Sequence, residues 1–311
     1  MDPARRSLER QSGAPAGHAA LVVVQFSFGL FPIVGVLAFG AGGFAPLAVA
    51  AWRMAFGAVA LGLLALALHG RRVVPARRDL PRLLLCATLG IALNQVFFME
   101  GLARSTPMNA GLVMCLIPVF TFIVAAVVRL ERFSAARALG VLFAGAGAVP
   151  LFLGEGTEFL GGHGFGNLLM VANSFFYAWY LVLSKPLVQR YPPLVVIAWL
   201  YGLSLVYLPF FLWSAPVLPA DPGSRAAWGA LGYILVFPTV VGYLFNAFAL
   251  SRLRATTTAV YIYMQPIITG VGSWLILGER LTPGLLRAAV LLFIGVWLVI
   301  RRPRQGTLVA D

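Results

Sequence analysis

The chain has 311 residues, of which 60% are hydrophobic and only 11% are Asp, Glu, Lys or Arg, and its mean hydropathy is +0.91. A soluble globular protein carries about 25% charged residues, so this composition excludes a soluble protein and indicates one that is integral to a membrane. The net charge of +13 does not indicate a nucleic-acid surface, because the arginines stand in short blocks between apolar runs, as membrane-flanking positive charge does.

Ten apolar segments follow one another along the chain, each close to the roughly 20 residues that a helix needs to cross a bilayer. They lie near 19–39, 45–68, 82–102, 106–128, 134–153, 165–184, 194–214, 226–250, 255–277 and 284–301. The connections are too short for a soluble domain, and the polar segments 1–18 and 302–311 are expected to form tails. The sequence therefore predicts an all-α polytopic membrane protein with ten transmembrane helices.

The distribution of Lys and Arg predicts the orientation of these helices. If the N-terminus lies inside, 18 of the 23 basic residues fall on the inner side and four on the outer side, while Arg53 lies within the second span. Positive charge collects on the cytoplasmic side of membrane proteins. We therefore expect a multi-pass protein of a bacterial inner (plasma) membrane with both termini in the cytoplasm.

An internal duplication relates the two halves of the chain. Pro118 and Pro266 are 148 residues apart, and so are Glu131 and Glu279. The same spacing relates Arg132 to Arg280, Arg104 to Arg252 and Gly147 to Gly295, and a spacing of 147 relates Pro46 and Trp52 to Pro193 and Trp199. Each copy, 19–153 and 165–301, holds five spans, an odd number, so the copies must have opposite orientations. Such inverted repeats are typical of secondary transporters with a substrate site near the membrane centre.

Each copy has the same order of features: small residues with Thr or Asn ("STPMNAG" and "ATTTA"), a proline in mid-span, a Glu-Arg pair, and a closing helix with an internal Gly. In this order the sequence resembles the EamA-type members of the drug/metabolite transporter superfamily. The resemblance implies a transporter that works by alternating access through a central cavity. One departure is that the first copy has "LER" where the second has the more usual "GER", which leaves the geometry of the first turn open.

The two prolines and the two glutamates have expected structural roles. Pro118 and Pro266 each precede the matched glutamate by 13 residues, about 20 Å along a helix, so we expect a kink near mid-depth that serves gating. Packing without a gating role is the alternative. Glu131 and Glu279 are expected to be turn residues whose carboxylates accept backbone N–H bonds at a helix entry, with direct substrate contact as the alternative.

Arg53 is the one strong cation deep within a predicted span, which makes it a candidate for substrate binding. Glu100, near the outer end of the third span, is its expected partner, although Glu100 is also spaced to pair with Arg104 at i+4. A purely structural ion pair, or an arginine that reaches outward to the membrane surface, is the alternative to a binding role.

Other candidates for the cavity are polar or aromatic residues placed at depth. The polar candidates are Asn94, Gln95, Asn173 and Gln265, together with Gln25 and Asn246, and the aromatic ones are Tyr177, Trp179, Tyr180, Tyr243, Tyr261 and Tyr263. Hydrogen bonding within the bundle is the competing use of the polar residues, and ordinary packing that of the aromatic ones. The aromatic set is suited to a partly apolar solute such as an amino acid.

Enzymatic function is not expected. The sequence has no HExxH motif, no Walker A loop and no Ser/His/Asp set at one depth, and Cys86 and Cys115 in apolar surroundings can build neither a disulfide framework nor a zinc cluster. We expect no cofactor, no metal and no nucleic acid, and as partners a small-molecule substrate and the lipid bilayer. The leading hypothesis, which rests on the resemblance, is export of an amino acid or related compound. The alternatives are a drug or other-metabolite exporter of the same fold, or a membrane enzyme or scaffold that transports nothing.

Overall fold

The structure is a computed structural model that describes residues 14–129, 135–149, 162–250, 261 and 264–300. Throughout these ranges the regular structure is helical, with no strand. Seven helices are long and apolar enough to cross a membrane, and three shorter apolar helices, Ala138–Gly147, Met264–Leu277 and Pro283–Gly295, stand where the other spans are predicted. The protein is an all-α polytopic membrane protein, as its sequence predicts.

The helices of the first repeat form five spans, several of them interrupted. In chain order they are α2 (Ala14–Gly29) with α3 (Phe31–Phe39); α4 (Pro46–His69); α5 (Leu80–Ala87), η3 (Thr88–Leu93) and α6 (Asn94–Leu102); α7 (Pro107–Val113) with α8 (Leu116–Val127); and α9 (Ala135–Ala148). Two short 3-10 turns, η1 (Gly70–Val73) and η2 (Arg77–Asp79), connect the second and third spans. Residues 14–18, part of the segment 1–18 that was expected to be a tail, belong to the helix α2.

The second repeat follows the same order of spans over its described residues, 164–250, 261 and 264–300. Its helices are α10 (Gly164–Arg190); α11 (Pro193–Ser204), η5 (Leu205–Tyr207) and α12 (Leu208–Ser214); α13 (Arg225–Ile234), η6 (Leu235–Val241) and α14 (Gly242–Leu250); α16 (Met264–Gly272) with η7 (Ser273–Leu277); and α17 (Pro283–Ile300). The sequence-based end of the sixth span, residue 184, is too early, because α10 continues through Pro186 to Arg190. Its last residue, Arg190, forms the ion pair with Asp79 that is described below.

The irregular segments recur at matching positions of the two repeats. The third span of each contains a π-helical segment, η3 and η6, and their first residues, Thr88 and Leu235, are 147 apart. π-Helical turns are rare and are frequent at functional sites. Because both copies have one at the same depth, the widened turn belongs to the repeated fold.

Pro118 stands just after an interruption of its span. It is the third residue of α8, whereas Pro266 lies in α16, and residues 262–263 before that helix are outside the described part of the chain. A proline ring clashes with the carbonyl four residues earlier, which for Pro118 belongs to Met114, and α7 ends one residue before Met114. The proline therefore stands in the first turn after a break in the span, where a missing N–H costs least.

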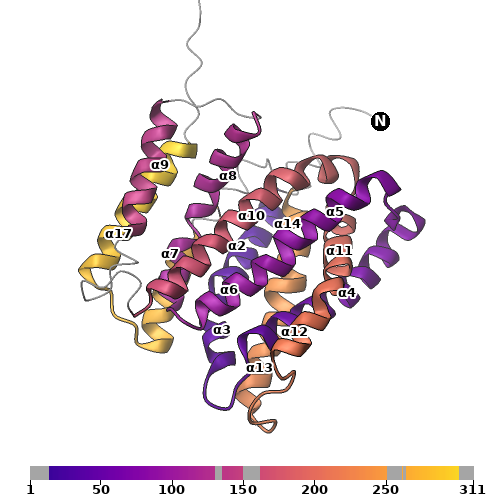
Figure 1. The fold of residues 1–311 in the computed structure, drawn as a ribbon, viewed down its shortest axis with the longest axis horizontal. Helices are drawn as coiled ribbons and strands as arrows, with labels where there is room; N and C mark the ends of the chain where they lie inside the picture. The colour runs from indigo at the N-terminus through magenta and orange to yellow at the C-terminus, as the bar shows by residue number, and fades with distance from the viewer. Residues whose placement is uncertain (1–13, 130–134, 150–161, 251–260, 262–263, 301–311) are drawn as a thin grey trace, which may run out of the picture.

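The repeats interlock in a reciprocal way (Figure 1). Equivalent helices pack on each other in two places, α9 on α17 and α4 on α11, at opposite edges of the bundle. The first helix of each repeat packs in the other repeat: α2 lies against α14 and α16, and α10 lies against their counterparts α6 and α8. This exchange is what two inverted copies related by a twofold axis produce, and it places the repeat interface at the centre of the bundle.

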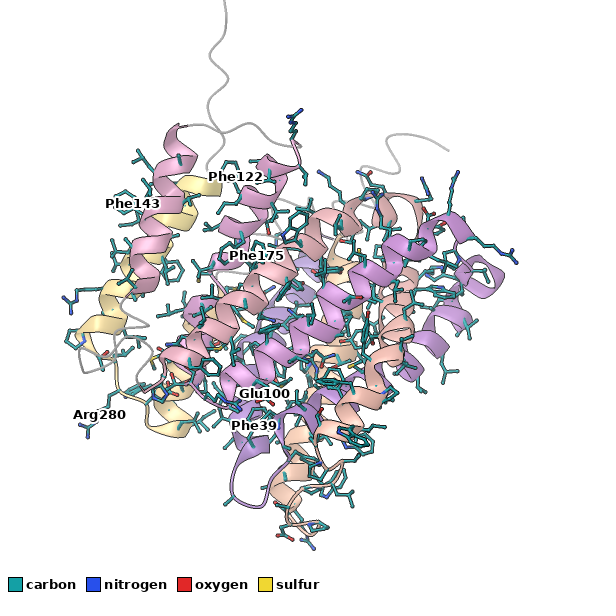
Figure 2. All side chains as sticks on the ribbon, in the orientation of Figure 1. Phe39, Glu100, Phe122, Phe143, Phe175 and Arg280 are labelled. Carbon is teal, nitrogen blue, oxygen red and sulfur yellow. The ribbon has the colours of Figure 1, made fainter. Side chains whose placement is uncertain are left out.

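The outside of the bundle is apolar. Exposed large side chains include Trp213, which is 92% exposed, and Leu142 on α9. Figure 2 shows Phe143 of the same helix pointing away from the other helices. In water such a surface would drive association, so its apolar side chains face lipid.

Candidate functional site

Buried polar contacts cross the interface between the two repeats. In each, a side chain bonds to a residue of the other repeat: Arg53 to Thr239, Asn173 to the carbonyl of Asn94, Gln265 to Gln25, Thr269 to the carbonyl of Gly29, and Ser174 to the carbonyl of Val113. Polar groups are costly in a membrane interior unless they bond to one another or line an aqueous cavity. Their gathering at the interface therefore marks the centre of the bundle as the candidate site.

Arg53 is held on α4 with 6% of its surface exposed. Its Nε–H donates to the Thr239 hydroxyl at 3.3 Å, and that hydroxyl donates in turn to the carbonyl of Ile234 at 2.9 Å. The guanidinium carbon lies 4.5 Å from the centre of the Phe31 ring, a cation–π distance. Arg53 is thus fixed by α3 and η6, one element from each repeat.

The expected pairing of Arg53 with Glu100 is not present. Glu100 instead forms an ion pair with Arg104, one turn later on the same helix. Figure 2 shows Glu100 near one end of the bundle, on α6. The i+4 alternative for Glu100 therefore holds, and the carboxylate is not part of the central polar set.

Gln95 on α6 is 2% exposed, and neither its amide nitrogen nor its amide oxygen has a hydrogen-bond partner among the described residues. The neighbouring Asn94 offers its backbone carbonyl to the amide of Asn173 at 2.8 Å, and Asn173 is also 2% exposed. An unsatisfied buried amide is expensive. Gln95 is thus the polar candidate whose hydrogen-bonding capacity the fold leaves unused.

Gln265 precedes Pro266 and donates its amide to Gln25 at 2.8 Å. One turn further along α16, Thr269 donates to the carbonyl of Gly29 at 2.6 Å. These bonds tie α16 to α2 of the other repeat. Tyr261 bonds through its hydroxyl to Nδ1 of His18 on α2 at 2.8 Å, and Tyr263 lies outside the described residues.

The aromatic candidates pack mostly against one another. Trp179 contacts the Phe175 ring, with 6.5 Å between ring centres, and Tyr177 contacts Tyr180 at 5.2 Å. Tyr180 is seated against Gly90, where a Cβ atom would come within 2.6 Å of its ring. The small residue on η3 thus allows the ring of α10 to approach the helix backbone.

A second aromatic group lies close to Arg53. Tyr243, one turn beyond Thr239, makes edge contacts with Tyr201 and with Phe28. Tyr201 packs on Gly57, where a Cβ atom would meet its ring at 2.5 Å. Arg53 and Gly57 are one turn apart on α4, so the Tyr201 ring packs on this helix one turn from Arg53.

Glu279 joins two spans that are distant in the sequence. Its carboxylate accepts from the backbone N–H of Met108 at 3.3 Å, in the first turn of α7. The helix that follows it, α17, is capped by Thr282 instead, which accepts from the N–H of Leu285. Burial raises the pKa of Glu279, whereas the bonds from Met108 and Thr106 lower it. Its counterpart Glu131 lies outside the described residues.

The turn at Glu279 also shows how the two copies differ. Gly278 has a φ of +68°, a left-handed conformation that glycine adopts at no cost, and ends η7. In the first copy, which lacks this glycine, Arg129 has a positive φ of 60°. By the spacing of 148, Arg129 aligns with Leu277, and the position aligned with Gly278 lies outside the described residues.

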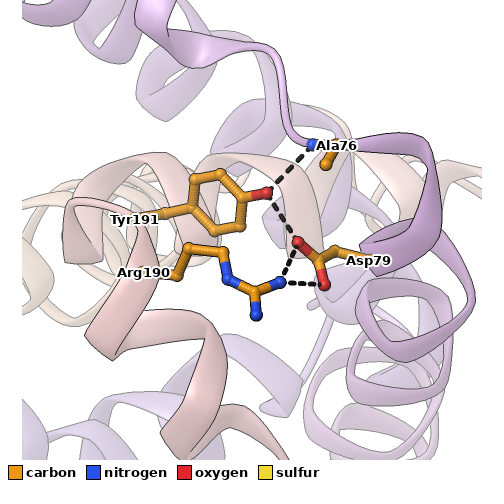
Figure 3. A network of polar contacts seen from close by, with 4 residues as sticks. All are labelled: Ala76, Asp79, Arg190 and Tyr191. Atoms are coloured by element: carbon orange, nitrogen blue, oxygen red, sulfur yellow. Dashed lines mark hydrogen bonds and ion pairs between the residues drawn. The ribbon is translucent and has the colours of Figure 1, made fainter.

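A polar network at one end of the bundle was not foreseen from the sequence (Figure 3). Arg190 at the end of α10 donates to both oxygens of Asp79, at 2.6 and 2.7 Å. The hydroxyl of Tyr191 donates to Asp79 at 2.6 Å and accepts from the N–H of Ala76. This end, which we call the Asp79 end, joins the two repeats. A single acid within the arginine-rich "ARRDLPR" was the available signal.

The opposite end, which we call the Asp221 end, also joins the repeats. The backbone N–H groups of Ala220 and Asp221 donate to the carbonyls of Gly43 and Gly42, both at 2.9 Å. Gly42 has a φ of +71°, so the turn depends on glycine. The 24-residue helix α4 separates the two ends by about 36 Å. The buried polar contacts lie between these ends.

Among the described residues no three His, Cys, Asp or Glu side chains gather as a metal site. Cys86 and Cys115 are buried and free. The polar groups that this region offers to a ligand are the buried amides and the guanidinium.

Comparison with known proteins agrees with this geometry. The model of the EamA-like transporter family matches residues 15–153 and again residues 164–301. The "Uncharacterized transporter YyaM" of Bacillus subtilis is 25% identical over 93% of this chain and 97% of its own length. A "Probable terminal-alkyne amino-acid exporter" of Streptantibioticus cattleyicolor is 28% identical over 88% of this chain and 89% of its own length. A solved crystal structure aligns with a TM-score of 0.63 and 17% identity, covering 93% of this chain and 96% of that one, which shows the fold alone.

Proposed function

The chain belongs to the EamA-like transporter family, and we propose that this membrane transporter exports an amino acid or a related small metabolite by alternating access. The family and the relatives named as transporters point to transport rather than catalysis. The family membership indicates transport, and the proposal adds to it the class of solute and the direction of transport. For both, the support is the relative from Streptantibioticus cattleyicolor that is named as an amino-acid exporter.

The observation that carries the proposal is that the buried hydrogen bonds of the bundle centre join one repeat to the other. Arg53 bonds to Thr239, Asn173 to Asn94, and Gln265 to Gln25. Substrate sites of inverted-repeat transporters lie near the midplane between the repeats. When the two repeats move relative to each other, the hydrogen bonds between them must break and re-form. Polar groups of a bound solute can then take the place of the lost partners.

In this proposal the solute lies between α4, α6, α10 and α16. Arg53, Gln95 and Asn173 supply polar contacts, and Trp179 with Tyr261 and Tyr263 supplies apolar ones. Pro118 and Pro266 mark the interrupted spans α7–α8 and α16–η7, which bend as access alternates. Glu279 has a structural role, because its bond to the N–H of Met108 attaches the end of the α16–η7 span to α7.

For orientation, we propose that the Asp79 end faces the cytoplasm of a bacterial cell. The basic residues Arg77, Arg78 and Arg82 lie at this end, and positive charge collects on the cytoplasmic side. Alkaline phosphatase fused after the polar C-terminal segment should be inactive if that terminus is cytoplasmic. An active fusion would contradict the orientation.

The test of the function is transport by the purified full chain in liposomes. Labelled amino acids, sugars and cationic drugs are supplied on either side, with and without a pH gradient. We expect amino acids to move faster than in protein-free liposomes. Preferential movement of cationic drugs would favour the alternative exporter, and no movement of any solute would favour a scaffold or an enzyme.

A further inference from the structure

Arg53 is a buried cation that uses few of its hydrogen-bond donors. A guanidinium has five N–H donors, and in the described part of the chain only the Nε–H of Arg53 has an acceptor, Thr239. Thr239 is neutral and also donates to a backbone carbonyl, so it does not balance the charge. A charge at this depth is costly unless something pairs with it.

No acid of the described residues neutralises Arg53. Asp79 is bound by Arg190, and Glu100 by Arg104. Asp221 accepts from the N–H of Gly223 in its turn, and Glu279 from the N–H of Met108. Each of these four carboxylates is held elsewhere, so the anion that balances Arg53 has to come from outside this part of the chain.

The duplicated fold provides an internal comparison. Trp52 corresponds to Trp199, so the position equivalent to Arg53 is Leu200, which is fully buried on α11. The second repeat therefore packs the same place with an aliphatic side chain. The repeated architecture alone therefore does not require a cation at this position.

A second unsatisfied group lies in the same region. The Arg53 guanidinium stands over Phe31, and Phe31 stacks on Phe98 with 5.1 Å between ring centres. Gln95 is three residues before Phe98 on α6 and so projects from the same helix face. Its amide donor and acceptor are both unused among the described residues. The Arg53 guanidinium and the Gln95 amide, both with unused hydrogen-bonding groups, are thus connected through the Phe31–Phe98 stack.

We infer that Arg53 binds the carboxylate of the transported solute, and that Gln95 binds a second polar group of the same solute. The inference rests on the proposed function and deepens it. The planar guanidinium can bind a carboxylate through two parallel N–H bonds, and the contacts with Phe31 and Thr239 fix its plane beforehand. Gln95 can accept from an ammonium or hydroxyl group, or donate to an oxygen. Solutes without a carboxylate are rejected because the cation then stays unpaired.

The experiment compares solutes that differ in the carboxylate alone. Labelled phenylalanine, leucine and threonine are each tested beside the carboxamide and the decarboxylated amine of the same molecule. Transport is measured with the full chain in liposomes. Binding is measured separately, as the shift in thermal unfolding of the purified protein, because a ligand that binds the folded state stabilises it. The variants are Arg53→Leu, which copies Leu200, Arg53→Lys and Gln95→Leu, with Arg287→Leu as the control at an exposed arginine of α17.

In the wild-type protein and the Arg287→Leu control, at least one carboxylate solute should be bound and transported at least about tenfold better than its carboxamide. Arg53→Leu should abolish this preference. Arg53→Lys should keep part of it, because a lysine retains the charge but not the paired donors. Gln95→Leu should weaken binding of the amino acid while leaving the preference for carboxylate over carboxamide.

The outcomes separate the inference from the proposed function. The inference would be overturned if the wild-type protein binds and transports carboxylates and carboxamides equally, or if no carboxylate shifts its thermal unfolding. It would also be overturned if Arg53→Leu keeps the preference for carboxylate over carboxamide. Carboxylate-specific stabilisation that depends on Arg53 without any transport would support the inference and contradict the transport function. If Arg53→Leu does not fold, the wild-type comparison of solutes and the Arg53→Lys variant still decide.

Discussion

Trp52 and Trp199 occupy equivalent positions of the two repeats, and each donates its indole N–H to a backbone carbonyl of the other repeat. Trp52 bonds to the carbonyl of Val217 at 3.0 Å, near the Asp221 end, and Trp199 to the carbonyl of Val73 at 2.6 Å, near the Asp79 end. The same residue type thus fastens opposite ends of the protein, as an inverted repeat requires.

Trp52→Phe and Trp199→Phe should therefore have opposite effects. Each keeps an aromatic ring but loses one hydrogen bond, worth about 1 kcal/mol, which changes a two-state population about fivefold. Trp52→Phe should raise amide hydrogen exchange in residues 215–224, and Trp199→Phe in residues 70–79. In each variant the other end should become more protected if, as proposed, the two ends open alternately. Increased exchange at the same end in both variants would contradict this.

The Asp79 network should stabilise the protein in a salt-dependent way. Asp79→Asn removes the charge that Arg190 binds, and since the Arg190 side chain is 47% exposed, we expect only a small loss of Tm. Salt screens exposed charges, so the difference in Tm between wild type and Asp79→Asn should shrink from about 0.1 M to about 1 M NaCl.

Tyr191→Phe is the companion variant for this network. It removes the hydroxyl that joins Asp79 to the N–H of Ala76 but leaves the ion pair, so its loss of Tm should be the same at both salt concentrations. A salt-independent effect of Asp79→Asn would mean that the ion pair contributes little.

The contact between α9 and α17 depends on glycine. A Cβ atom at Gly147 would come within 2.7 Å of the backbone nitrogen of Leu292, and one at Gly295 within 2.4 Å of the backbone nitrogen of Ala144. Backbone atoms cannot move aside as side chains can, and small residues are what let membrane helices approach this closely.

Gly147→Val should therefore separate α9 from α17 and lower the Tm of the purified protein. Gly145→Val, two residues earlier on the same helix, is the matched control, because a Cβ atom there meets nothing within 4 Å. Both variants add the same β-branched side chain, so any cost of helix propensity cancels. Equal Tm values would show that the close contact is not needed for stability.

Much of the fold follows from the sequence, because hydrophobic length and a spacing of 148 are properties of the chain alone. Pro118 was expected to kink its span near mid-depth, and in the structure it is the third residue of α8, after the end of α7 at Val113. The break one turn earlier follows from the carbonyl that the proline ring displaces.

The partners of the buried polar residues were less predictable. Arg53 bonds to Thr239, 186 residues away, whereas the sequence suggested Glu100. Such partners are set by which helix faces meet, and composition and periodicity do not contain that information. The Asp79 network was missed for the same reason, since its members are 111 and 112 residues apart.

Glu279 allows a prediction about pH. Burial raises the pKa of its carboxyl, with the bonds from Met108 and Thr106 and the nearby His163 opposing the shift. The folded state therefore holds a proton on Glu279 at a pH where the unfolded chain has released it. Where the folded state binds more protons, the free energy of unfolding falls as pH rises. This loss begins near the ordinary pKa of the carboxyl and is complete above the raised one.

Glu279→Gln should abolish this loss while retaining an oxygen that accepts from Met108. The Tm of the variant minus that of the wild type should therefore grow as pH rises from about 4 to about 8, measured on the purified full chain. Glu279→Ala removes the acceptor and leaves the N–H of Met108 unsatisfied, so its Tm should lie below that of Glu279→Gln at every pH. A Tm difference between Glu279→Gln and wild type that shrinks with rising pH would mean that the bonds from Met108 and Thr106 outweigh the cost of burying the charge.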